Sequence, residues 1–546
     1  MDQYSSLNSS IFVKTYRSFL KGGGDLVIDH IIKPYIKINP SLHPKAGVDQ
    51  FDIEGFTYTY YRLPKLIYSV EKIYLAQRLD LFKRAGLNID KWNEISSPAR
   101  RRKMYFDGKS KLAVYINSAT DVDDFVSLLT AYQIEFNKLH TSALKLKKHN
   151  FENLCRNLKF NPKEKSRINN LIGPNKKQFL DHIKKAKINF HVSLIRGSYI
   201  DYQKAAQQWF GDIVKRTQYP DFVEKPVYFI HSNTHSIVNS ITGWATSLES
   251  KLVGYMKKKK MDNLLEYWEK IDKDDQAGLR ENLLWYVLKK YEKDYPEVHQ
   301  QRIAYEQEMG IDYIEARKYL DVNVQIISLK KLSKSSLVKK LGMNLKKLDK
   351  SNGYIFNIDY PLGYGAYMVL STMLANCNQI KGVYLLGKAS FFTGSLGDVG
   401  LPEHVLDERS ENDFFFRNAF SRKDFPNISG VNVLEHQKAA SIKGTLMTYS
   451  GQWEKLYEKG VTIVEMENGP YLNALYEATH YERYPEGQTL NLVNSSIDIG
   501  IIHYASDTPF TKAVTLGTRN LGYEGVDATY ASSLAILRRI IKKVTK

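Results

Sequence analysis

The sequence VTIVEMENGP at residues 461–470 decides the fold that is predicted for the C-terminal part of this chain. Residues 461–465 form an apolar, β-branched run of strand length, and the spacing of apolar residues over 469–481 predicts a helix. A strand that leads directly into a helix is typical of an α/β fold, and residues at such junctions lie at the sheet edge where α/β proteins bind ligands. Glu465, Met466 and Glu467 are therefore candidate site residues.

Short apolar runs and helical spacing alternate on both sides of this stretch. The alternation predicts a C-terminal α/β domain at residues 321–546 with a mixed central sheet. We expect its helices over 366–376, 469–481 and 527–543, and its strands over 322–327, 354–359, 382–386, 431–434, 461–465 and 497–504.

Three further motifs follow predicted strands of this domain. A turn with Gly363 and Gly365 precedes a helix, where glycines permit close backbone approach and the helix start offers free amides. A second turn begins Gly387-Lys388 and is followed by Gly-Asp at 397–398. The last strand ends in Ser-Asp at 506–507. Each motif alone fits an ordinary turn, cap or surface ion pair, but their combination and order favour a site.

A Glu and an Asp at the ends of different strands can meet over the carboxyl edge of one sheet. Cleavage of an N-ribosidic bond requires two such carboxyl groups. One holds the ribose hydroxyls, and the other helps to protonate the departing base. A methionine beside the first would pack against the apolar face of the sugar.

With these motifs in this order, residues 354–543 resemble the nucleoside phosphorylase-I superfamily. That superfamily includes purine nucleoside phosphorylases, methylthioadenosine/S-adenosylhomocysteine nucleosidase and AMP nucleosidase. Its VEME signature is present unaltered at 464–467, and its terminal Ser-Asp at 506–507. Its glycine turns and base-binding segment are matched more loosely, by residues 363–366, 387–390, 397–398 and 443–453. The resemblance covers the last third of the chain and implies a phosphorylase-like α/β/α domain.

The resemblance implies a role for each matching residue. Glu467 would bind the ribose hydroxyls, Met466 would lie under the sugar, and Asp507 would be the general acid at N7 of a purine. Tyr449 or Trp453 would stack on the base, and Arg519 would support Asp507. The other candidate binding residues are Glu465, Ser506, Gly387, Lys388, Gly363 and Gly365. Because family members assemble as dimers, trimers or hexamers, we expect a homo-oligomer.

Two departures from the family concern the nucleophile. Phosphorylases place a phosphate-binding arginine where this chain has Leu385, and Lys388 replaces the serine after the glycine of the second turn. Lys388 could still hold phosphate as a point charge. Water is the better-supported nucleophile, although the water-activating Glu of the family nucleosidases has no counterpart near residues 322–332.

We therefore expect a nucleosidase that cleaves a purine nucleoside or nucleotide, without a cofactor or a metal. One alternative is a nucleoside phosphorylase with inorganic phosphate as its co-substrate. The other is a non-catalytic nucleotide sensor whose basic N-terminal half binds nucleic acid or a protein partner.

The first 320 residues predict two further regions. Residues 1–185 are expected to form a mainly helical domain, because segments such as 63–87 and 121–140 space apolar residues by three and four. Residues 186–320 are expected to form a small α/β unit, with strands at 188–195 and 226–230, followed by long helices to residue 320. The polar residues 231–236 would contact a ligand, or Ser232 or Thr234 would cap the next helix.

The net charge of +19 is distributed unevenly, with +21 on residues 1–350 and −2 on residues 351–546. Such asymmetry points to a polyanion or phosphorylated ligand for the first part, or simply to lysine-rich solvated helices. The basic runs 100–103 and 257–260 lack the interleaved aromatics of a single-strand binder. We expect both runs on exposed faces, with phosphate contact as the alternative.

Composition excludes several protein classes. Cys155 and Cys377 are the only cysteines, too few for a disulfide framework or a CxxC zinc site. The N-terminus does not resemble a signal peptide, and the uncharged stretch 361–380 contains too many glycine and amide residues for a membrane span. A cytoplasmic protein without a membrane segment is expected.

Overall fold

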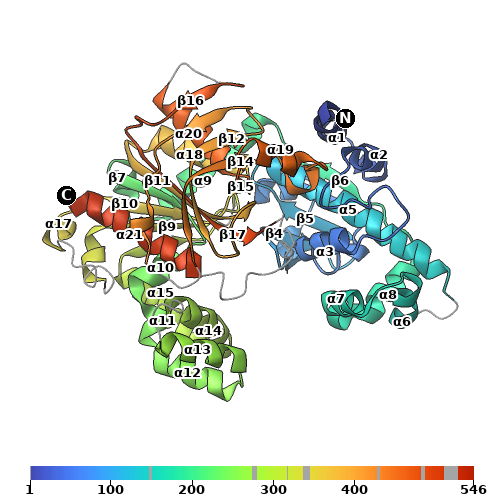
Figure 1. The fold of residues 1–546 in the computed structure, drawn as a ribbon, viewed down its shortest axis with the longest axis horizontal. Helices are drawn as coiled ribbons and strands as arrows, with labels where there is room; N and C mark the ends of the chain where they lie inside the picture. The colour runs from blue at the N-terminus through green and yellow to red at the C-terminus, as the bar shows by residue number, and fades with distance from the viewer. Residues whose placement is uncertain are drawn as a thin grey trace.

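Two β-sheets organise the computed structural model (Figure 1). The structure describes residues 2–146, 150–273, 280–316, 318–335, 345–426, 431–480, 486–508 and 527–545. No helix in these ranges is long and apolar enough to cross a membrane.

The first sheet has six strands in the order β1-β6-β2-β5-β4-β3. The central strand β2 runs parallel to β5 and β6, and the other pairings are antiparallel. Its strands are β1 (Leu26–Val27), β2 (Lys72–Ala76), β3 (Asn93–Ser97), β4 (Arg100–Phe106), β5 (Lys111–Tyr115) and β6 (His191–Leu194). The helices of this half are α1 (Asp2–Lys21), α2 (Asp29–Ile38), α3 (Ile53–Arg62), α4 (Leu79–Arg84), α5 (Ala119–Leu144), α6 (Phe151–Asn157), α7 (Pro162–Ile172), α8 (Lys176–Lys185) and α9 (Tyr199–Arg216).

The second sheet has eleven strands and is mixed, as expected. Its order is β16-β13-β12-β14-β15-β11-β7-β10-β9-β8, and β17 pairs with β11 and β12. Its strands are β7 (Pro226–His231), β8 (Ile311–Ile314), β9 (Val324–Ser328), β10 (Tyr354–Ile358), β11 (Gln379–Phe391), β12 (Val399–Asp407), β13 (Asp413–Phe415), β14 (Val433–Ser441), β15 (Ile463–Glu465), β16 (Thr489–Asn491) and β17 (Asp498–Asp507). Its helices are α10 (His235–Thr242), α17 (Leu345–Asp349), α18 (Tyr364–Asn376), α19 (Gln452–Glu458), α20 (Asn468–Thr479) and α21 (Asp527–Thr545).

Between β7 and β8 the chain forms a separate group of helices, which projects from the body of the molecule (Figure 1). These helices have their own cluster of buried apolar side chains, which Tyr530 of α21 joins. They are α11 (Trp244–Ser247), α12 (Glu249–Lys258), α13 (Asp262–Lys273), α14 (Arg280–Asp294) and α15 (Pro296–Glu308).

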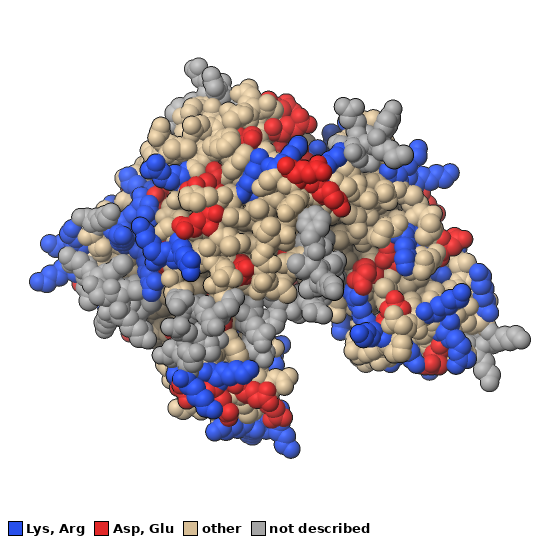
Figure 2. Space-filling view, viewed as in Figure 1, with Lys and Arg blue, Asp and Glu red and all other residues tan. Residues whose placement is uncertain are grey.

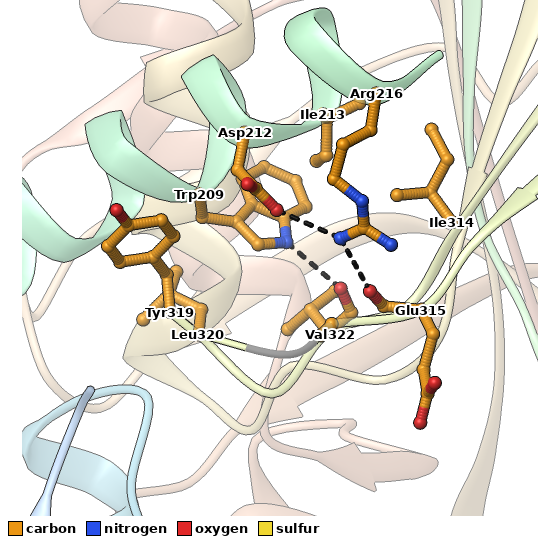
Figure 3. A pocket seen from close by; sticks show the side chains of 10 residues that line it. Trp209, Asp212, Ile213, Arg216, Ile314, Glu315, Tyr319, Leu320 and Val322 are labelled. Carbon is orange, nitrogen blue, oxygen red and sulfur yellow. Dashed lines mark hydrogen bonds and ion pairs between the residues drawn. The ribbon is translucent and has the colours of Figure 1, made fainter. Parts of the chain in front are cut away.

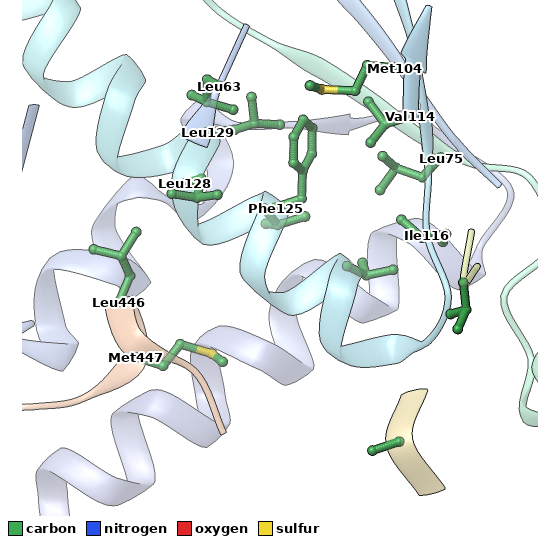
Figure 4. Close-up of a cluster of buried hydrophobic side chains, with 14 of the residues drawn as sticks. Leu63, Leu75, Met104, Val114, Ile116, Phe125, Leu128, Leu129, Leu446 and Met447 are labelled. Atoms are coloured by element: carbon green, nitrogen blue, oxygen red, sulfur yellow. The ribbon is translucent and has the colours of Figure 1, made fainter. Parts of the chain in front are cut away.

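The buried core continues from the first sheet into the C-terminal part. Helix α5 presents Phe125, Leu128 and Leu129 to the first sheet, where Leu75 and Val114 are buried (Figure 4). Leu446 and Met447, three hundred residues later in the chain, are buried in the same cluster and 3% exposed. The two halves therefore share apolar surface that neither half could bury alone.

The predicted strands and helices of residues 321–546 are present, but several elements differ from the expectation. Strands β12, β13 and β16 were not predicted, and β14 extends to Ser441. Strand β8 interrupts the region expected to be helical up to residue 320. Strand β7 also belongs to this sheet, so the sheet draws on residues before 321.

Residues 1–185 contain more helix than strand, but five strands of the first sheet also lie there and were not predicted. Within 63–87, expected as one helix, the chain forms β2 and the short α4. In β2 the apolar residues Ile73, Leu75 and Ala76 are buried, because this strand is central in the sheet. The runs at 188–195 and 226–230 are strands, but they belong to different sheets.

The helix after β7 is capped by Asn233 and not by Ser232 or Thr234. Asn233 Oδ1 accepts a 2.9 Å hydrogen bond from the Ser236 amide, and the Thr234 side chain makes no capping bond. Ser232 instead donates to Asn357 Oδ1 at 2.8 Å, which links β7 to β10.

Basic residues are spread over the surface and alternate with acidic ones on the face shown in Figure 2. The run 257–260 is exposed, as expected. The run 100–103 is not uniformly exposed, because it lies in strand β4 and its side chains alternate. Arg100 and Arg102 are 9% and 6% exposed and face acidic residues of α5, whereas Arg101 is solvent-accessible on the other face.

Arg102 joins the two halves of the molecule. Its guanidinium donates to the carbonyl oxygens of Asp321 at 3.1 Å and Tyr360 at 2.9 Å, and pairs with the Asp121 carboxylate at 3.4 Å. Replacing Arg102 by Ala is expected to lower the free energy of unfolding by about 3–5 kcal/mol, because the buried Asp121 carboxylate loses a partner. Urea denaturation measures this change. The control is Arg84→Ala, a more exposed ion pair with an expected effect below about 1 kcal/mol. Equal effects of the two variants would contradict the role of Arg102.

Candidate active site

Parallel strands β7, β10, β11 and β17 bring their carboxyl ends to one edge of the second sheet. At this edge, Ser390 of β11 pairs with Asp507 of β17 on one side and with Val464 of β15 on the other. Adjacent strands lie about 4.8 Å apart, so the backbone of Asp507 and that of the VEME segment are separated by about 10 Å. The sheet thus brings the two predicted acidic motifs to opposite sides of one strand.

Glu467 lies at the start of α20, directly after the VEME strand. Its Oε1 accepts a 3.2 Å hydrogen bond from the amide of Gly363, in the turn before α18. Burial raises the pKa of the Glu467 carboxyl above its ordinary value, and the Gly363 and Met466 amides and the charges of Lys388 and Arg102 oppose this shift. Part of Glu467 remains accessible to solvent, so a ligand can reach it.

Gly363 is required at this turn. Its φ of 50° is in the left-handed region, and a Cβ there would lie 2.6 Å from the Thr120 methyl carbon. Thr120 Oγ1 accepts a 2.9 Å hydrogen bond from the Tyr364 amide. The first turn of α5 therefore packs against the glycine turn. Gly365 and Gly387 have more space, since an added Cβ would meet its nearest atom at 3.4 and 3.6 Å.

Glu465 positions the segment that carries Glu467. It is 5% exposed and accepts hydrogen bonds from the backbone amides of Glu467, at 2.5 Å, and Asn468, at 2.8 Å, and from the Ser441 hydroxyl. Burial and the charge of Glu467 raise its pKa. Its lone pairs are directed at its own chain, so we assign Glu465 to the support of the site rather than to ligand contact.

Asp507 and Lys388 lie at the same edge. Ser506 Oγ donates to Asp507 Oδ2 at 2.8 Å and approaches the Ala389 carbonyl oxygen at 3.2 Å. The side chain of Lys388 is solvent-accessible. The surrounding protein and the positive charges of Arg62 and Arg101 lower the pKa of Lys388, while the charges of Asp507 and Glu467 raise it. Lys388 is therefore within electrostatic range of both acidic residues.

The two candidate stacking residues are packed in the structure. Trp453 is 7% exposed and meets the Phe392 ring edge-on at 5.6 Å, in an apolar cluster against which Met466 also packs. Tyr449 is 9% exposed and bridges to Pro40 of the first half. Contacts within the protein therefore explain the positions of both side chains without a bound base. Arg519 lies outside the described residues.

Four further residues lie at this edge: Arg101 of the basic run 100–103, His231 of the polar residues 231–236, and Tyr360 and Asp359, which were not singled out from the sequence. Arg101 places its Cζ 4.6 Å from the centre of the Tyr360 ring, and that ring lies 4.7 Å from the ring of His231. Asp359, at the end of β10, has a pKa raised to about 6 by burial. The alternation of a strand could have marked Arg101, whereas the other three come together only through the pairing of β7 with β10.

The described residues contain no group of three His, Cys, Asp or Glu side chains that could hold a metal ion. One small cavity, with a volume of about 10 Å³, lies between α9 and the segment that runs from Ile314 at the end of β8 to Val322 (Figure 3). The polar groups around it pair with protein atoms. Trp209 Nε1 donates to the Val322 carbonyl at 2.9 Å, and Arg216 binds both Asp212 and the Glu315 carbonyl at 2.9 Å. This cavity has the size of one water molecule and belongs to the packing of the sheet.

Comparison with known proteins gave one family and a set of solved structures. The model of a family of unknown function (DUF6909) matches residues 28–542. No curated protein matches the chain. A methylthioadenosine phosphorylase from an Antarctic soil metagenomic library matches at 10% identity and a TM-score of 0.28, over 43% of this chain and 80% of that one. The methylthioadenosine/S-adenosylhomocysteine nucleosidase of Campylobacter jejuni matches at 13% identity and a TM-score of 0.28, over 43% and 92%.

Proposed function

This chain belongs to the DUF6909 family, whose function is unknown, and for this member we propose hydrolysis of the N-ribosidic bond of a purine nucleoside or nucleotide. The observation that carries the proposal is that Val464, three residues before Glu467, and Asp507 pair with Ser390 from its two sides. In this reaction Glu467 accepts hydrogen bonds from the ribose hydroxyls, and Asp507 delivers a proton to the base as the C1′–N9 bond breaks. Met466 packs under the sugar.

A nucleotide is the favoured substrate within this class, because basic side chains face the same edge. Arg101 and Lys388 are solvent-accessible, and neither takes part in an ion pair between described residues. Burial and the charge of Arg62 lower the pKa of Lys388, and the charge of Arg101 lowers it further. On α14, burial and the charge of Arg302 lower the pKa of Lys289, with a smaller contribution from Arg101. Solvent-accessible cations brought near one another outside such ion pairs are typical of a site for a phosphate group, although Lys388 also lies in the field of Asp507 and Glu467.

Replacing Arg101 by Ala is therefore expected to raise KM for a 5′-nucleotide about 10- to 100-fold and to leave KM for the corresponding nucleoside unchanged. The difference should shrink as salt is added. Steady-state assays of base release with adenosine and AMP measure it. Lys258→Ala, an exposed lysine on α12, is the control and should change neither KM. Equal losses on both substrates in the Arg101 variant would argue against a phosphate contact.

One experiment tests the function itself. The purified protein is incubated with a panel of purine nucleosides and 5′-nucleotides, with and without inorganic phosphate, and free base is measured by chromatography. Release that does not depend on phosphate, with ribose or ribose phosphate as co-product, is the expected result. The absence of free base from every compound would overturn the proposal.

Phosphorolysis is the second candidate, and the solvent-accessible Lys388 beside Arg62 favours it. Release that requires phosphate and yields ribose 1-phosphate would establish this alternative in place of hydrolysis.

A further inference from the structure

His231 ends strand β7 in the middle of the candidate site. Its neighbours in the sheet are Ile358 of β10 and Leu385 of β11, so it lies between the two strands that lead to the glycine turn and to Lys388. The ring is 3% exposed, and Nε2 has no hydrogen-bond partner among the described residues. Burial, with smaller contributions from the charges of His503 and Arg101, lowers the pKa of His231 to about 3. The ring is therefore neutral near pH 7, and one of its nitrogens is free to accept a hydrogen bond.

A second polar group of this kind lies beside His231. Tyr471 of α20 is fully buried, its ring centre is 5.4 Å from that of His231, and its hydroxyl has no partner among the described residues. The Tyr471 amide donates to the Glu467 carbonyl oxygen at 3.0 Å, one turn into the same helix. The charge of Glu467 contributes to the raised pKa of Tyr471, second to burial. Tyr471 is thus close enough to Glu467 to feel the charge of its carboxylate, and His231 lies directly beside Tyr471.

An unpartnered hydroxyl alone does not indicate a site. Tyr132 in the core of the first half is also fully buried and lacks a partner, but its ring neighbours are Phe56, Phe136 and Phe190 and, farther away, Tyr60. His231 and Tyr471 differ from it because they lie at the carboxyl edge of parallel strands, beside Glu467. Buried polar groups that find no protein partner commonly bind water, and a bound water needs two or more such partners.

We infer that His231, with Tyr471 as a second partner, binds and orients the water that attacks C1′ of the ribose and accepts its proton. This inference rests on the proposed hydrolysis. It assigns His231 to the activation of water, for which residues 322–332 contain no glutamate counterpart. The C1′–N9 bond breaks, and its electron pair goes to the base, which Asp507 protonates. The water oxygen forms the new bond to C1′, and its proton passes to His231 and then to solvent.

The test compares His231→Leu, His231→Gln and Tyr471→Phe with the wild-type protein. His231→Leu is expected to slow base release about 10²-fold, near the lower limit for proton transfer catalysis because a histidine of low pKa is a weak base. His231→Gln keeps a hydrogen-bond acceptor and should retain part of the rate. Tyr471→Phe should lose about 10-fold, the worth of one buried hydrogen bond. The control is Tyr132→Phe, which should keep the full rate.

A second measurement separates this role from a structural one. Base release in water containing methanol gives both ribose and methyl riboside, and their ratio reports which nucleophile reaches C1′. In the wild type, the bound water should react in preference to methanol, so the fraction of methyl riboside among the products should be below the fraction of methanol in the solvent. In His231→Leu, the fraction of methyl riboside among the products should approach the fraction of methanol in the solvent. Circular dichroism checks that each variant is folded. If His231→Leu does not fold, His231→Gln and Tyr471→Phe provide the test.

The outcomes distinguish the two proposals. If the wild type releases base but the folded His231 variants keep its rate and its product ratio, the inference about His231 is overturned and the proposed function stands. If the wild type releases no base from any compound, both are overturned.

Discussion

Replacing Asp507 by Asn is expected to reduce the rate of base release by about 10² to 10⁴, because the variant cannot give a proton to the departing base. The change preserves the size of the side chain and its ability to accept from Ser506, which holds the carboxylate at 2.8 Å. The fold should therefore remain intact. The rate is measured under single-turnover conditions, so that product release does not hide the chemical step.

Two controls make the Asp507 result specific. Asp90→Asn changes an exposed aspartate of the first half, paired with Lys83, and should leave the rate unaltered. A substrate whose leaving group departs without protonation, such as a nitrophenyl riboside, should lose little rate in Asp507→Asn. If both substrates lost the same factor, Asp507 would not be the general acid.

Replacing Glu467 by Gln is expected to reduce kcat/KM by about 10² to 10³. A carboxylate that accepts hydrogen bonds from two hydroxyls loses about 1.5–2 kcal/mol for each when its charge is removed, or about 3–4 kcal/mol together. The Gly363 amide keeps an acceptor, since the glutamine oxygen can occupy the position of Oε1. The effect should thus come from the ligand and not from the turn.

Removing the ribose hydroxyls from the substrate provides a matched test of the same contact. Wild type should discriminate strongly against a 2′,3′-dideoxynucleoside, and Glu467→Gln should show most of this discrimination lost, as expected when two changes remove one interaction. If the losses from the substitution and from removal of the hydroxyls were fully additive, the hydroxyls would not contact Glu467.

The pH dependence follows from the same residue. Burial raises the pKa of Glu467, so its charged form is lost as pH falls through a value higher than that of an ordinary glutamate. Wild-type kcat/KM should decline on the acid side over this range, and the decline should be absent in Glu467→Gln.

The sequence could predict the candidate site where its residues lie at local junctions. Residues 464–467 and 506–507 lie where predicted strands end, but the direction of each strand came only from the structure, in which β15 runs antiparallel and β17 parallel to β11. For His231 and Arg101 the sequence offered ligand contact only as one of two alternatives, because strand pairing and the packing of one half on the other bring these two residues to the edge. Nor could it show that Trp453 packs against Phe392, since an aromatic residue near a binding motif looks the same whether it meets a base or a neighbour.

The fold of the first half was harder to predict for a related reason. Over 63–87 the apolar spacing satisfies a helical period, yet the chain forms a central strand because β5 and β6 pair with both of its edges. The spacing of apolar residues can fit both a helix and a strand. Here the neighbouring strands decide that the segment is a strand.

The contact of Thr120 with Gly363 has a consequence for how such a protein can change over time. The turn that binds Glu467 is shaped by a helix from the other half, and strand β7 comes from before residue 321. A gene fragment that encoded only the last third would lack both the strand and the helix that the glycine turn rests on. The candidate site could therefore not be inherited as a separate C-terminal segment, and the two halves of the chain must evolve together.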